Sequence, residues 1–459
     1  NIYVTNTYQS DIASDKSYKQ VVQLKKTRKG YDDVKSMNVD ASQYVEEMQI
    51  VYDNDIAKWM INRPKKVIKS VRDKAGNIVG DVRLIEYCMD SPTKIAKEKR
   101  IPNASGDMND SLMLVVSYKY DKIGNMIEQR ISSPSLKANK IIRSEYGSKY
   151  QYRYKTKSID ELGRTTSCEY DDDFGILKST MDFNNLKTII DNEPFGIEST
   201  VIMPDGVRNV KAIRWSDNNR YAPQNASYYL WEKSSGKAET MIFCHKSGAE
   251  LRQVTFDLNG EAVFVDKIYD DLGNLKQESC PYYESDAKLY VSNVYDMYNR
   301  KVETSYPNGM NVAFVYDGNS VEMEYSVAGN TKKHRKETYN MRGWLIKAVD
   351  DGGKEIRYEY YSDGKIKTTQ IGENKATRIE VTYDNRRNKA SLYDPNYGLI
   401  SYKNDALGNV KKVYDAQNVV VYDYDVMGRM VSKIENNLVN NIRNEINWEY
   451  GNSSGRNGV

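Results

Sequence analysis

The chain has 459 residues, 39% of them hydrophobic and 29% charged, and its 67 basic residues nearly balance 64 acidic ones. This interspersed, near-neutral charge gives no reason to expect nucleic acid or an anionic membrane as a partner. With 38 Tyr the sequence is too aromatic for a disordered chain, and with only 7 Phe it is poorly suited to fill a large compact core. No apolar run approaches the roughly 18 residues that cross a bilayer, so we expect no membrane span.

Residues 1–118 form the first region, which we interpret as divergent β-rich repeats. The region begins with NIYVTNTYQSD, which lacks an initiator Met and the charged start and apolar stretch of a signal peptide. We therefore expect a mature piece or an internal fragment of a protein that is secreted or displayed at the cell surface. Residues 40–62 come nearest to a helix, but the alternation through residues 44–50 favours a strand equally well.

Residues 119–265 form the second region, a repeat sheet with longer insertions. It opens on YDKIGNMIEQR at 120–130, in which Tyr-Asp leads to Gly-Asn and then to alternating apolar and polar residues. Such a phrase is typical of a β-hairpin: a strand, a tight turn and a second strand.

Residues 266–435 form the third region, in which the phrase recurs regularly. The leading residues of its later copies are 22, 22, 21 and 20 residues apart, at Tyr339, Tyr361, Tyr383, Asn404 and Tyr424. A weaker turn falls halfway along several units, so each unit is a pair of short strands. Turns every ten or so residues predict an all-β fold, a long antiparallel sheet of hairpins. Because twist accumulates, such a sheet must coil into a spiral or close. The remaining residues, 436–459, are interpreted as a C-terminal end and a truncation point.

The turn in YDDLGNL, residues 269–275, has a local physical explanation. The Asp270 carboxylate can accept hydrogen bonds from the backbone ahead of it, which favours a type I turn. Gly273 then supplies a left-handed residue and a bulge. At Arg387, where the Gly is missing, we expect Asn388 to take the left-handed conformation. The same Asp and Gly roles are predicted at Asp121, Gly124, Asp160, Gly163, Asp296, Gly343, Asp384, Asp405, Gly408, Asp425 and Gly428.

Tyr-rich segments lie between the turns. In YQYRYKT, residues 150–156, the alternation predicts a strand with three rings on one face. We expect the Tyr side chains to stack over successive repeats as a ladder of cross-strand aromatic pairs. A sugar-binding stripe of aromatic rings is the alternative. The predicted members of the ladder are Tyr150, Tyr152, Tyr154, Tyr358, Tyr360, Tyr422 and Tyr424.

The series Tyr-Asp-x-x-Gly-[Asn/Arg], about every 20 residues, resembles the YD repeat of the RHS proteins. A finer likeness is to the B component of Tc insecticidal toxins and its relatives. It is carried by WMINRPKKV at 59–67, by MPDGV at 203–207, and by the longer segments at 250–274 and 306–326. The resemblance implies a hollow β-shell around a toxic C-terminal domain, or a surface adhesion module. The family's closing motif and its self-cleaving acids have no counterpart here, so none is carried over.

Candidates for catalysis or metal binding are weak. Cys244 and His245 are adjacent, and neighbours in a strand point to opposite faces. The acids at 171–173 and 284–286 could hold Ca²⁺, but they lack the spacing of an EF-hand loop. No glycine-rich phosphate loop precedes a helix. We predict no catalytic residue, no metal and no cofactor, and we expect the thiols to be reduced and buried on strands: Cys88, Cys168, Cys244 and Cys280.

Three hypotheses follow. The first is a non-enzymatic YD-repeat scaffold, part of a secreted toxin shell whose effector domain lies in cis or in a separate chain. An immunity protein or a delivery apparatus would be further partners. The second is a cell-surface adhesion or glycan-binding module built on the same repeats. The third is a hydrolase hidden in the repeat sheet, which a cleft of acids with perturbed pKa values would reveal.

Overall fold

The computed structural model describes residues 2–8, 21–30, 42–54, 57–73, 75–89, 93–193, 196–327 and 331–451. Within them it has 36 strands, the short 3-10 helices η1 (Ser148–Tyr150) and η2 (Lys375–Thr377), and no α-helix. The predicted all-β class is confirmed. The ambiguous segment at 40–62 contains a strand, β3. In the part of the chain that is described, no helix is long and apolar enough to cross a bilayer.

The strands follow one another along the whole chain. The first twelve are β1 (Ile2–Tyr8), β2 (Val21–Gly30), β3 (Ser42–Tyr52), β4 (Pro64–Arg72), β5 (Ile78–Tyr87), β6 (Ile95–Ile101), β7 (Leu114–Tyr120), β8 (Met126–Ser132), β9 (Lys140–Tyr146), β10 (Lys155–Ile159), β11 (Thr165–Tyr170) and β12 (Leu177–Met181). The next twelve are β13 (Lys187–Asn192), β14 (Glu198–Ile202), β15 (Arg208–Trp215), β16 (Tyr228–Ser234), β17 (Thr240–Cys244), β18 (Glu250–Phe256), β19 (Ala262–Tyr269), β20 (Leu275–Ser279), β21 (Tyr282–Tyr283), β22 (Tyr290–Tyr295), β23 (Lys301–Ser305) and β24 (Met310–Asp317). The last twelve are β25 (Ser320–Val327), β26 (Thr331–Tyr339), β27 (Leu345–Val349), β28 (Glu355–Tyr360), β29 (Ile366–Ile371), β30 (Ile379–Tyr383), β31 (Lys389–Asp394), β32 (Gly398–Asn404), β33 (Val410–Tyr414), β34 (Asn418–Tyr424), β35 (Met430–Asn437) and β36 (Ile442–Asn447).

The sheet is one antiparallel meander in which each strand pairs with the next along the chain, apart from one detour. At the detour, β19 pairs with both β20 and β21, and β20 then pairs with β22. Cys280 and Pro281 separate β20 from β21, and a proline cannot donate to the strand ladder. Among the described strands β1 and β36 do not pair with each other, so the sheet is open. The predicted region boundaries at 118, 265 and 435 stay predictions.

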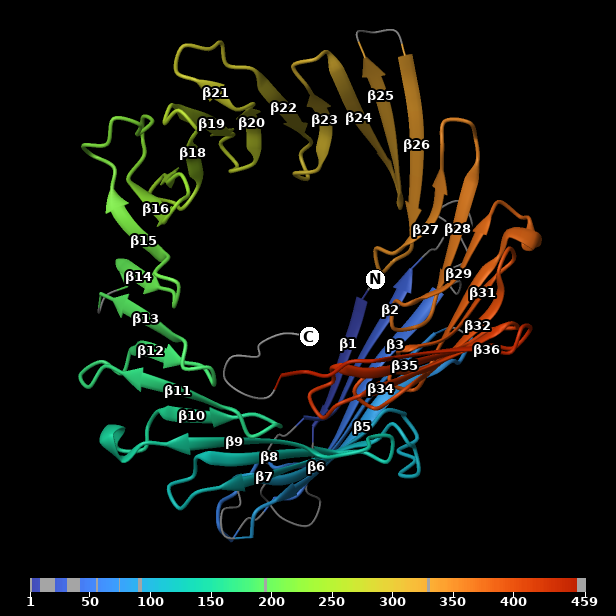
Figure 1. Ribbon diagram of the computed structural model, residues 1–459. Coiled ribbons are helices and arrows are strands. Elements are labelled where there is room, and N and C mark those ends of the chain that lie inside the picture. Colours follow the sequence, from blue (N-terminus) through green and yellow to red (C-terminus); the bar gives the residue numbers. More distant parts are fainter. Residues whose placement is uncertain are drawn as a thin grey trace.

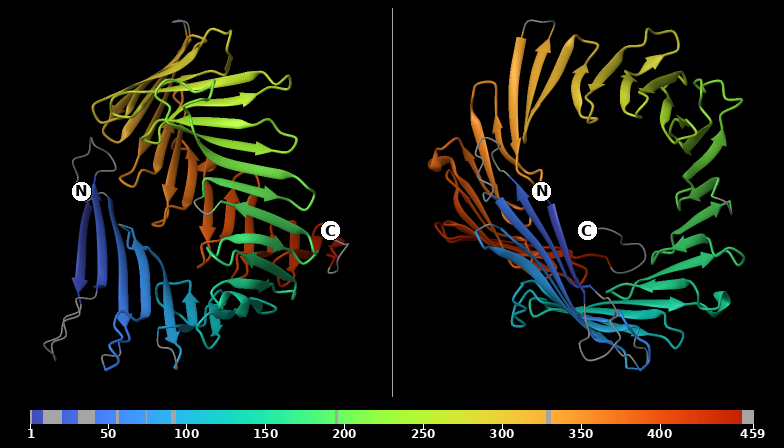
Figure 2. Two further views of the ribbon diagram at one scale, coloured as in Figure 1. Left: turned by 90° about the vertical axis from the view of Figure 1, so that its left-hand side faces the viewer. Right: turned by 180° about the vertical axis from the view of Figure 1, so that it is seen from behind.

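The sheet curves around an open centre, and its C-terminal strands come to lie against its N-terminal strands (Figure 1). Figure 2 shows the same spiral from the side and from behind. The chain has an accessible surface of 28,564 Å² for a mass of 52.8 kDa, whereas a compact monomer of that mass would expose only about 17,700 Å². The fold is therefore a wall that exposes both faces over much of its length. This confirms the expected coiled antiparallel sheet.

Burial in this wall is correspondingly thin and partly polar. In the described residues, 17 apolar and 14 polar or charged residues are buried, and a dense core would show a far larger apolar excess. Eight of the 17 buried apolar residues lie in what we call the middle arc, β15–β22 with the loop 216–227, and six lie on β5–β7 and the loop before β7. In the middle arc Phe243 and Val254 are fully buried, together with Tyr229, Met241, Phe264 and Tyr282.

A second layer forms this core. The loop 216–227 folds over the sheet, and the Tyr221 ring lies 5.7 Å from the Phe256 ring and 5.9 Å from the Phe264 ring. Ser216 fixes the loop by donating its hydroxyl to the Ala226 carbonyl at 2.6 Å. A second set of fully buried apolar side chains, Val82, Ile101 and Val116, lies on β5–β7.

The spiral overlaps at a seam between turns. Because neighbouring strands are antiparallel, alternate turns lie on opposite rims of the sheet. We call rim A the one that carries the turns after β26, β28, β30, β32 and β34, and rim B the one that carries the turns after β4, β6, β8, β10 and β12. The seam is the set of hydrogen bonds that join rim A of the C-terminal strands to the N-terminal strands and their rim B.

Candidate functional site

The repeated turn at Asp270–Asn274 shows what the motif encodes. One Asp270 carboxylate oxygen accepts the backbone N–H of Leu272 at 3.0 Å and that of Asn274 at 2.8 Å. The Gly273 N–H donates to the Asp270 carbonyl at 3.0 Å, and Gly273 has a φ of +85°. These bonds lower the pKa of the Asp270 carboxyl, chiefly through its hydrogen bonds with Asn274. The Asp therefore serves the turn as a hydrogen-bond acceptor.

The residue after the Gly completes the turn, a role that sequence analysis missed. Asn274 donates its side-chain amide to the second Asp270 oxygen at 3.1 Å. Asn and Arg share this position because both can donate to a carboxylate four residues back. The equivalent donor–acceptor pairs are Asn125–Asp121, Arg164–Asp160, Arg300–Asp296, Asn388–Asp384, Asn409–Asp405 and Arg429–Asp425.

The Tyr before the turn joins neighbouring hairpins, a second role not foreseen. The Tyr295 hydroxyl, at the end of β22, donates to the Leu275 carbonyl at the start of β20 at 2.9 Å. The recurrence of Tyr before Asp was the available signal, because a phenol at a strand end can donate to the adjacent strand. The same bond joins Tyr120 to Ile95, Tyr170 to Lys155, Tyr316 to Lys301, Tyr360 to Leu345 and Tyr424 to Val410.

Two turns depart from the predicted pattern. In the turn after Asp384, Arg387 has the positive φ, 66°, so the expectation that Asn388 would take it is wrong. Asn388 instead donates to Asp384, as Asn274 does to Asp270. In the turn after Asp296, Asn299 replaces Gly with a φ of 59°. The predicted glycines all have positive φ: Gly124, Gly163, Gly273, Gly343, Gly408 and Gly428.

The predicted strand at 150–156 is wrong for residues 150–154, and a strand begins only at Lys155, in β10. Residues 148–150 form η1, and Gln151 and Tyr152 have φ values of 54° and 57°, which interrupts the alternation. Tyr150 and Tyr154 nevertheless pack, because both rings contact Tyr170 at 5.6 and 4.9 Å between centroids. Tyr152 turns away, with 42% of its surface exposed. The three rings therefore do not share one strand face.

The other predicted ladder members lie on regular strands. Tyr358 and Tyr360 are on β28, and Tyr422 and Tyr424 are on β34, all half-buried. The Tyr360 ring lies 5.3 Å from the Trp344 ring. Because Tyr360 and Tyr424 direct their hydroxyls to backbone carbonyls, these two rings contribute to the sheet itself.

Cys244 and His245 do not form a catalytic pair in this structure. Cys244 is buried at the end of β17, and burial raises the pKa of its thiol. The His245 ring contacts the Ser247 hydroxyl at 2.8 Å within the next turn. All four cysteines are free, but only Cys244 is buried, so the expectation of burial is wrong for Cys88, Cys168 and Cys280. Cys88 and Cys280 also lie just outside strands.

The acids of the two acidic runs accept hydrogen bonds from residues close to them in the chain. Asp171 accepts the backbone N–H groups of Asp173 and Phe174, both at 2.9 Å, and its hydrogen bond with Lys178 lowers the pKa of its carboxyl to about 2. Asp286 accepts the Tyr283 N–H at 3.0 Å. No group of three potential metal ligands occurs among the described residues.

A charge cluster around a buried carboxylate lies in the middle arc and stabilises it. The buried Asp266 carboxylate binds Arg252 at 2.6 and 3.0 Å, the Tyr282 hydroxyl at 2.7 Å and Lys288 at 2.8 Å. Despite the opposing effect of burial, these donors lower the pKa of Asp266 to about 2. Arg252 also donates to the Tyr221 carbonyl at 3.1 Å, which holds the covering loop. All the charges in the cluster are paired.

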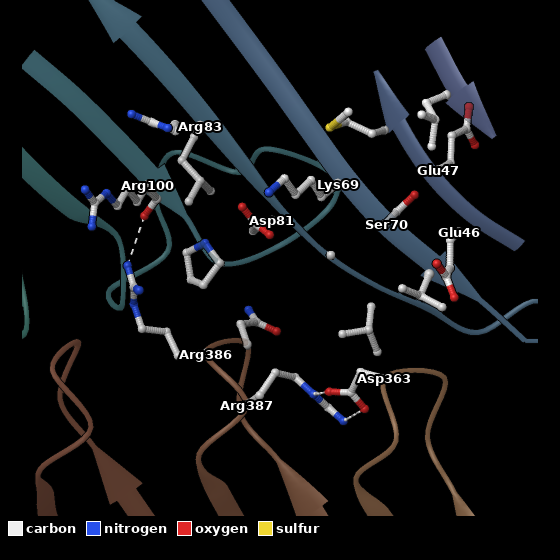
Figure 3. Close-up of a pocket in the computed structure, with 18 residues that line it drawn as sticks. Glu46, Glu47, Lys69, Ser70, Asp81, Arg83, Arg100, Asp363, Arg386 and Arg387 are labelled. Carbon is white, nitrogen blue, oxygen red and sulfur yellow. Dashed lines mark hydrogen bonds and ion pairs between the residues drawn. The ribbon is translucent and has the colours of Figure 1, made fainter. Parts of the chain in front are cut away.

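A pocket of about 640 Å³ lies in the seam, lined by β2–β6 and by the turns at 363 and 385–387. Figure 3 shows that Arg386 extends from its turn to the Arg100 carbonyl, 3.0 Å away. Arg387, the next residue in the same turn, binds Asp363. Arg386 also donates to the Leu112 carbonyl at 2.6 Å, and burial together with the nearby Arg100 charge lowers its pKa. The pocket is thus bridged by structural contacts between the two ends of the spiral.

Comparison with solved structures shows the same fold in Tc toxin chains. "Crystal Structure of TcdB2-TccC3-TEV" matches 95% of this chain with a TM-score of 0.70 and 11% identity. The structure titled "TcdB2-TccC3 without hypervariable C-terminal region" matches 95%, with a TM-score of 0.70 and 12% identity. A Tc holotoxin pore of Photorhabdus luminescens matches 94%, with a TM-score of 0.68 and 11% identity.

This chain spans about a third of the length of those chains, 32%, 32% and 31%. No protein-family model and no curated protein matches the sequence. At such low identity the likeness establishes the fold. The resemblance to Tc-toxin YD-repeat shells that the sequence indicated is confirmed at that level.

Proposed function

We propose that the chain is a non-enzymatic scaffold, a segment of the wall of a secreted toxin shell that encloses or presents a C-terminal effector domain. The effector would lie in the same polypeptide or in a separate chain, with an immunity protein or a delivery apparatus as further partners. The observation that carries the proposal is the surface of 28,564 Å², more than half as large again as that of a compact protein. A curved wall that exposes both faces is suited to surround something else.

The chemistry of the repeats supports the same proposal. Asp, Gly, Asn or Arg, and Tyr of the motif all hold backbone groups in turns or between hairpins. A catalytic site needs a nucleophile or acid–base pair that is free to act on a substrate. Residues committed to turn geometry contribute stability, so we expect substitutions in them to change folding.

The alternative, a glycan-binding surface module, is favoured by a few exposed aromatic rings. Trp215 is 79% exposed, Tyr298 71% and Tyr397 81%. They lie on β15 and in the turns after β22 and β31, separate elements of the wall. A glycan array separates the two proposals, because saturable sugar binding that is lost in Trp215→Ala would favour the adhesion module.

Protection of a fused domain from protease tests enclosure. A small folded reporter is joined to the C-terminal end of the chain, and its digestion is compared with that of the same reporter mixed in free. We expect the fused reporter to be digested much more slowly. Opening the seam with Arg386→Ala should accelerate its digestion, whereas Tyr298→Ala on the exposed rim should not. Equal digestion of fused and free reporter would overturn the proposal.

A further inference from the structure

The seam pocket has an apolar floor that the strand register creates. Leu24 pairs with Met48 across β2 and β3, and Val71 pairs with Val79 across β4 and β5. Glu46, which shares a strand face with Met48, pairs with Val71, so both rows lie on one face of the sheet. We call the four apolar residues, all half-buried, the pocket floor. The volume of about 640 Å³ is typical of a small-molecule site.

A second pocket of about 420 Å³ continues the floor along the strands. The two pockets share four residues, among them Met48 and Arg83, and the second adds Ile50 and Val67. In the register Ile50 pairs with Val67, and Val67 pairs with Arg83. An apolar body that lies on the floor can therefore extend along the same face of the sheet.

One end of the pocket is positively charged. Figure 3 shows Arg83, Arg100 and Arg386 on the same side of it. Arg83 and Arg100 both bind the carboxylate of Glu98, Arg100 at 3.0 Å, and Glu98 is only 3% exposed. Its carboxylate is thus shared by two guanidinium groups and is shielded from the pocket.

Arg386 brings a third guanidinium group to this end. Its bonds go to the backbone carbonyls of Leu112 and Arg100, and no carboxylate of the described residues forms an ion pair with it. Three positive charges therefore share one negative charge. Burial and the Arg100 charge lower the pKa of Arg386, although Asp110 acts in the opposite direction. An anion in the pocket would reverse that shift.

The other charged residues of the lining do not cancel this excess. Glu47, which accepts the Gln49 amide at 2.8 Å, lies on the side of the pocket opposite the three arginines (Figure 3). The remaining charges lie in pairs of opposite sign: Asp363 with Arg387 at 2.7 Å, Glu46 with Arg342 at 2.9 Å, and Lys69 with Asp81 as partners in the register of β4 and β5.

We propose that the pocket binds a small organic anion, with its carboxylate or phosphate on Arg386 and Arg100 and its apolar body on the pocket floor. A guanidinium group offers both kinds of head group two parallel N–H donors. Because Arg386 belongs to the turn after β30 and the floor to β2–β5, the bound molecule joins both ends of the spiral and holds the seam closed. The site does not depend on whether the wall encloses an effector.

Calorimetric titration of the full chain tests the site. The probes are octanoate and octyl phosphate, which share an apolar body and differ in the head group. We expect at least one of them to bind saturably, about tenfold or more tightly than octanol or inorganic phosphate, and the tighter one identifies the head group. Absence of saturable binding would overturn the proposal. Equal or tighter binding of octanol or of octyltrimethylammonium would do so too, because the arginines would then contribute nothing.

Two neighbouring substitutions locate the bound probe. Val79→Asp places a carboxylate on the pocket floor and should weaken binding about tenfold or more. Ile78→Asp is the matched control, since Ile78 is 50% exposed and precedes Val79 on the same strand, so it points to the opposite face. It should leave the affinity unchanged. Equal affinities of the two variants would place the probe elsewhere and overturn the proposal.

Hydrogen exchange of the unaltered chain tests the effect on the seam without any substitution. A ligand that binds only the closed seam, at 100 times its Kd, should slow exchange through seam opening by up to about 100-fold. We expect this slowing at residues 102–113 and 384–388, with the amides of β17–β19 unchanged. Binding without slower exchange at these two segments would show that the probe does not join the two ends of the spiral, and would overturn the proposal.

Discussion

The middle arc and the seam hold the spiral in different ways. In the middle arc the loop 216–227 covers the sheet, and a fully buried Phe243 lies in an aromatic cluster beside the Asp266 ion network. In the seam, contact is made by turn tips, and Arg386 bonds to two backbone carbonyls beside a pocket of about 640 Å³. Apolar burial is the main stabilising term in folding, and single polar contacts contribute less.

The difference indicates which part of the spiral needs a high free energy to unfold and which part opens at a lower free energy. Regions with little apolar burial open locally at a lower free energy than regions with a core. We therefore expect the seam to separate while the middle arc stays folded.

Removing the central ring of the middle arc should have the largest effect. Phe243→Ala leaves a cavity in the one aromatic core of the described residues and should lower the free energy of unfolding by about 3–5 kcal/mol. Phe174→Ala, at a side chain that is 62% exposed, is the matched control and should cost little. Urea unfolding of both variants measures the effect, and similar losses would contradict the assigned core.

Removing the charge of Asp266 should have the second-largest effect on the free energy of unfolding. Asp266→Asn leaves Arg252 and Lys288 without their carboxylate, which should cost about 3 kcal/mol at neutral pH. The folded pKa of Asp266, about 2, lies below that of an unfolded Asp, which is about 3.9. The stabilisation is therefore fully present above the unfolded pKa and is lost as the pH falls through the folded value. Unfolding measured at several pH values should show wild type and variant converging toward pH 2; a constant difference would exclude this origin.

Weakening the seam should have a smaller effect on stability than either substitution in the middle arc. Arg386→Ala removes the bonds to the Leu112 and Arg100 carbonyls, and should lower the free energy of seam opening by about 1–3 kcal/mol. Hydrogen exchange of residues 102–113 and 384–388 should accelerate, while the amides of β17–β19 stay protected. Tyr298→Ala changes the equivalent position of an exposed turn and should alter neither segment. Faster exchange throughout the molecule would show that the two regions unfold together.

Local chemistry explains which features the sequence could predict. The bonds that form the Asp270 turn lie within five residues, so Asp, Gly and their spacing predicted the turn and, by repetition, the sheet. The left-handed Gln151 and Tyr152 carry no such signal, and the alternation of Tyr150–Tyr154 wrongly favoured a strand. Arg387 takes a conformation that Asn usually prefers, because Asn388 is already bound to Asp384.

The seam and the middle arc core were not predictable in the same way. Arg386 donates to the carbonyl of Leu112, which is 274 positions away in the chain. No pattern around either residue predicts that contact. The loop 216–227 covers the sheet through Tyr221. This residue is one of 38 Tyr, and nothing in the sequence distinguishes it from the others. The seam contact arises from how far the sheet curves, which is set by many small twists.

Two glycines of the same motif allow a finer comparison of a docked and a free turn. Gly273 and Gly408 have φ values of +85° and +91°, so a side chain at either should cost about 1 kcal/mol through backbone strain. A Cβ at Gly408 would also lie 3.2 Å from the Asn388 Oδ1, whereas one at Gly273 meets open space. We expect Gly408→Ala to lower the unfolding midpoint more than Gly273→Ala. The reverse order would mean that the contact with Asn388 relaxes without cost.

The smallest expected effect concerns the bond that joins hairpins. Tyr295→Phe keeps the ring and removes only the hydroxyl that donates to Leu275, so the lost hydrogen bond should cost about 0.5–1.5 kcal/mol. Tyr298→Phe, at a ring 71% exposed in the neighbouring turn, is the control and should be neutral. Because Tyr295 ties β22 to β20 and not to its own hairpin, exchange should quicken at the β20–β22 ladder and stay unchanged within the turn at 296–300. Faster exchange confined to that turn would show that the Tyr stabilises its own hairpin, and would remove the distinction between bonds that form a repeat and bonds that join repeats.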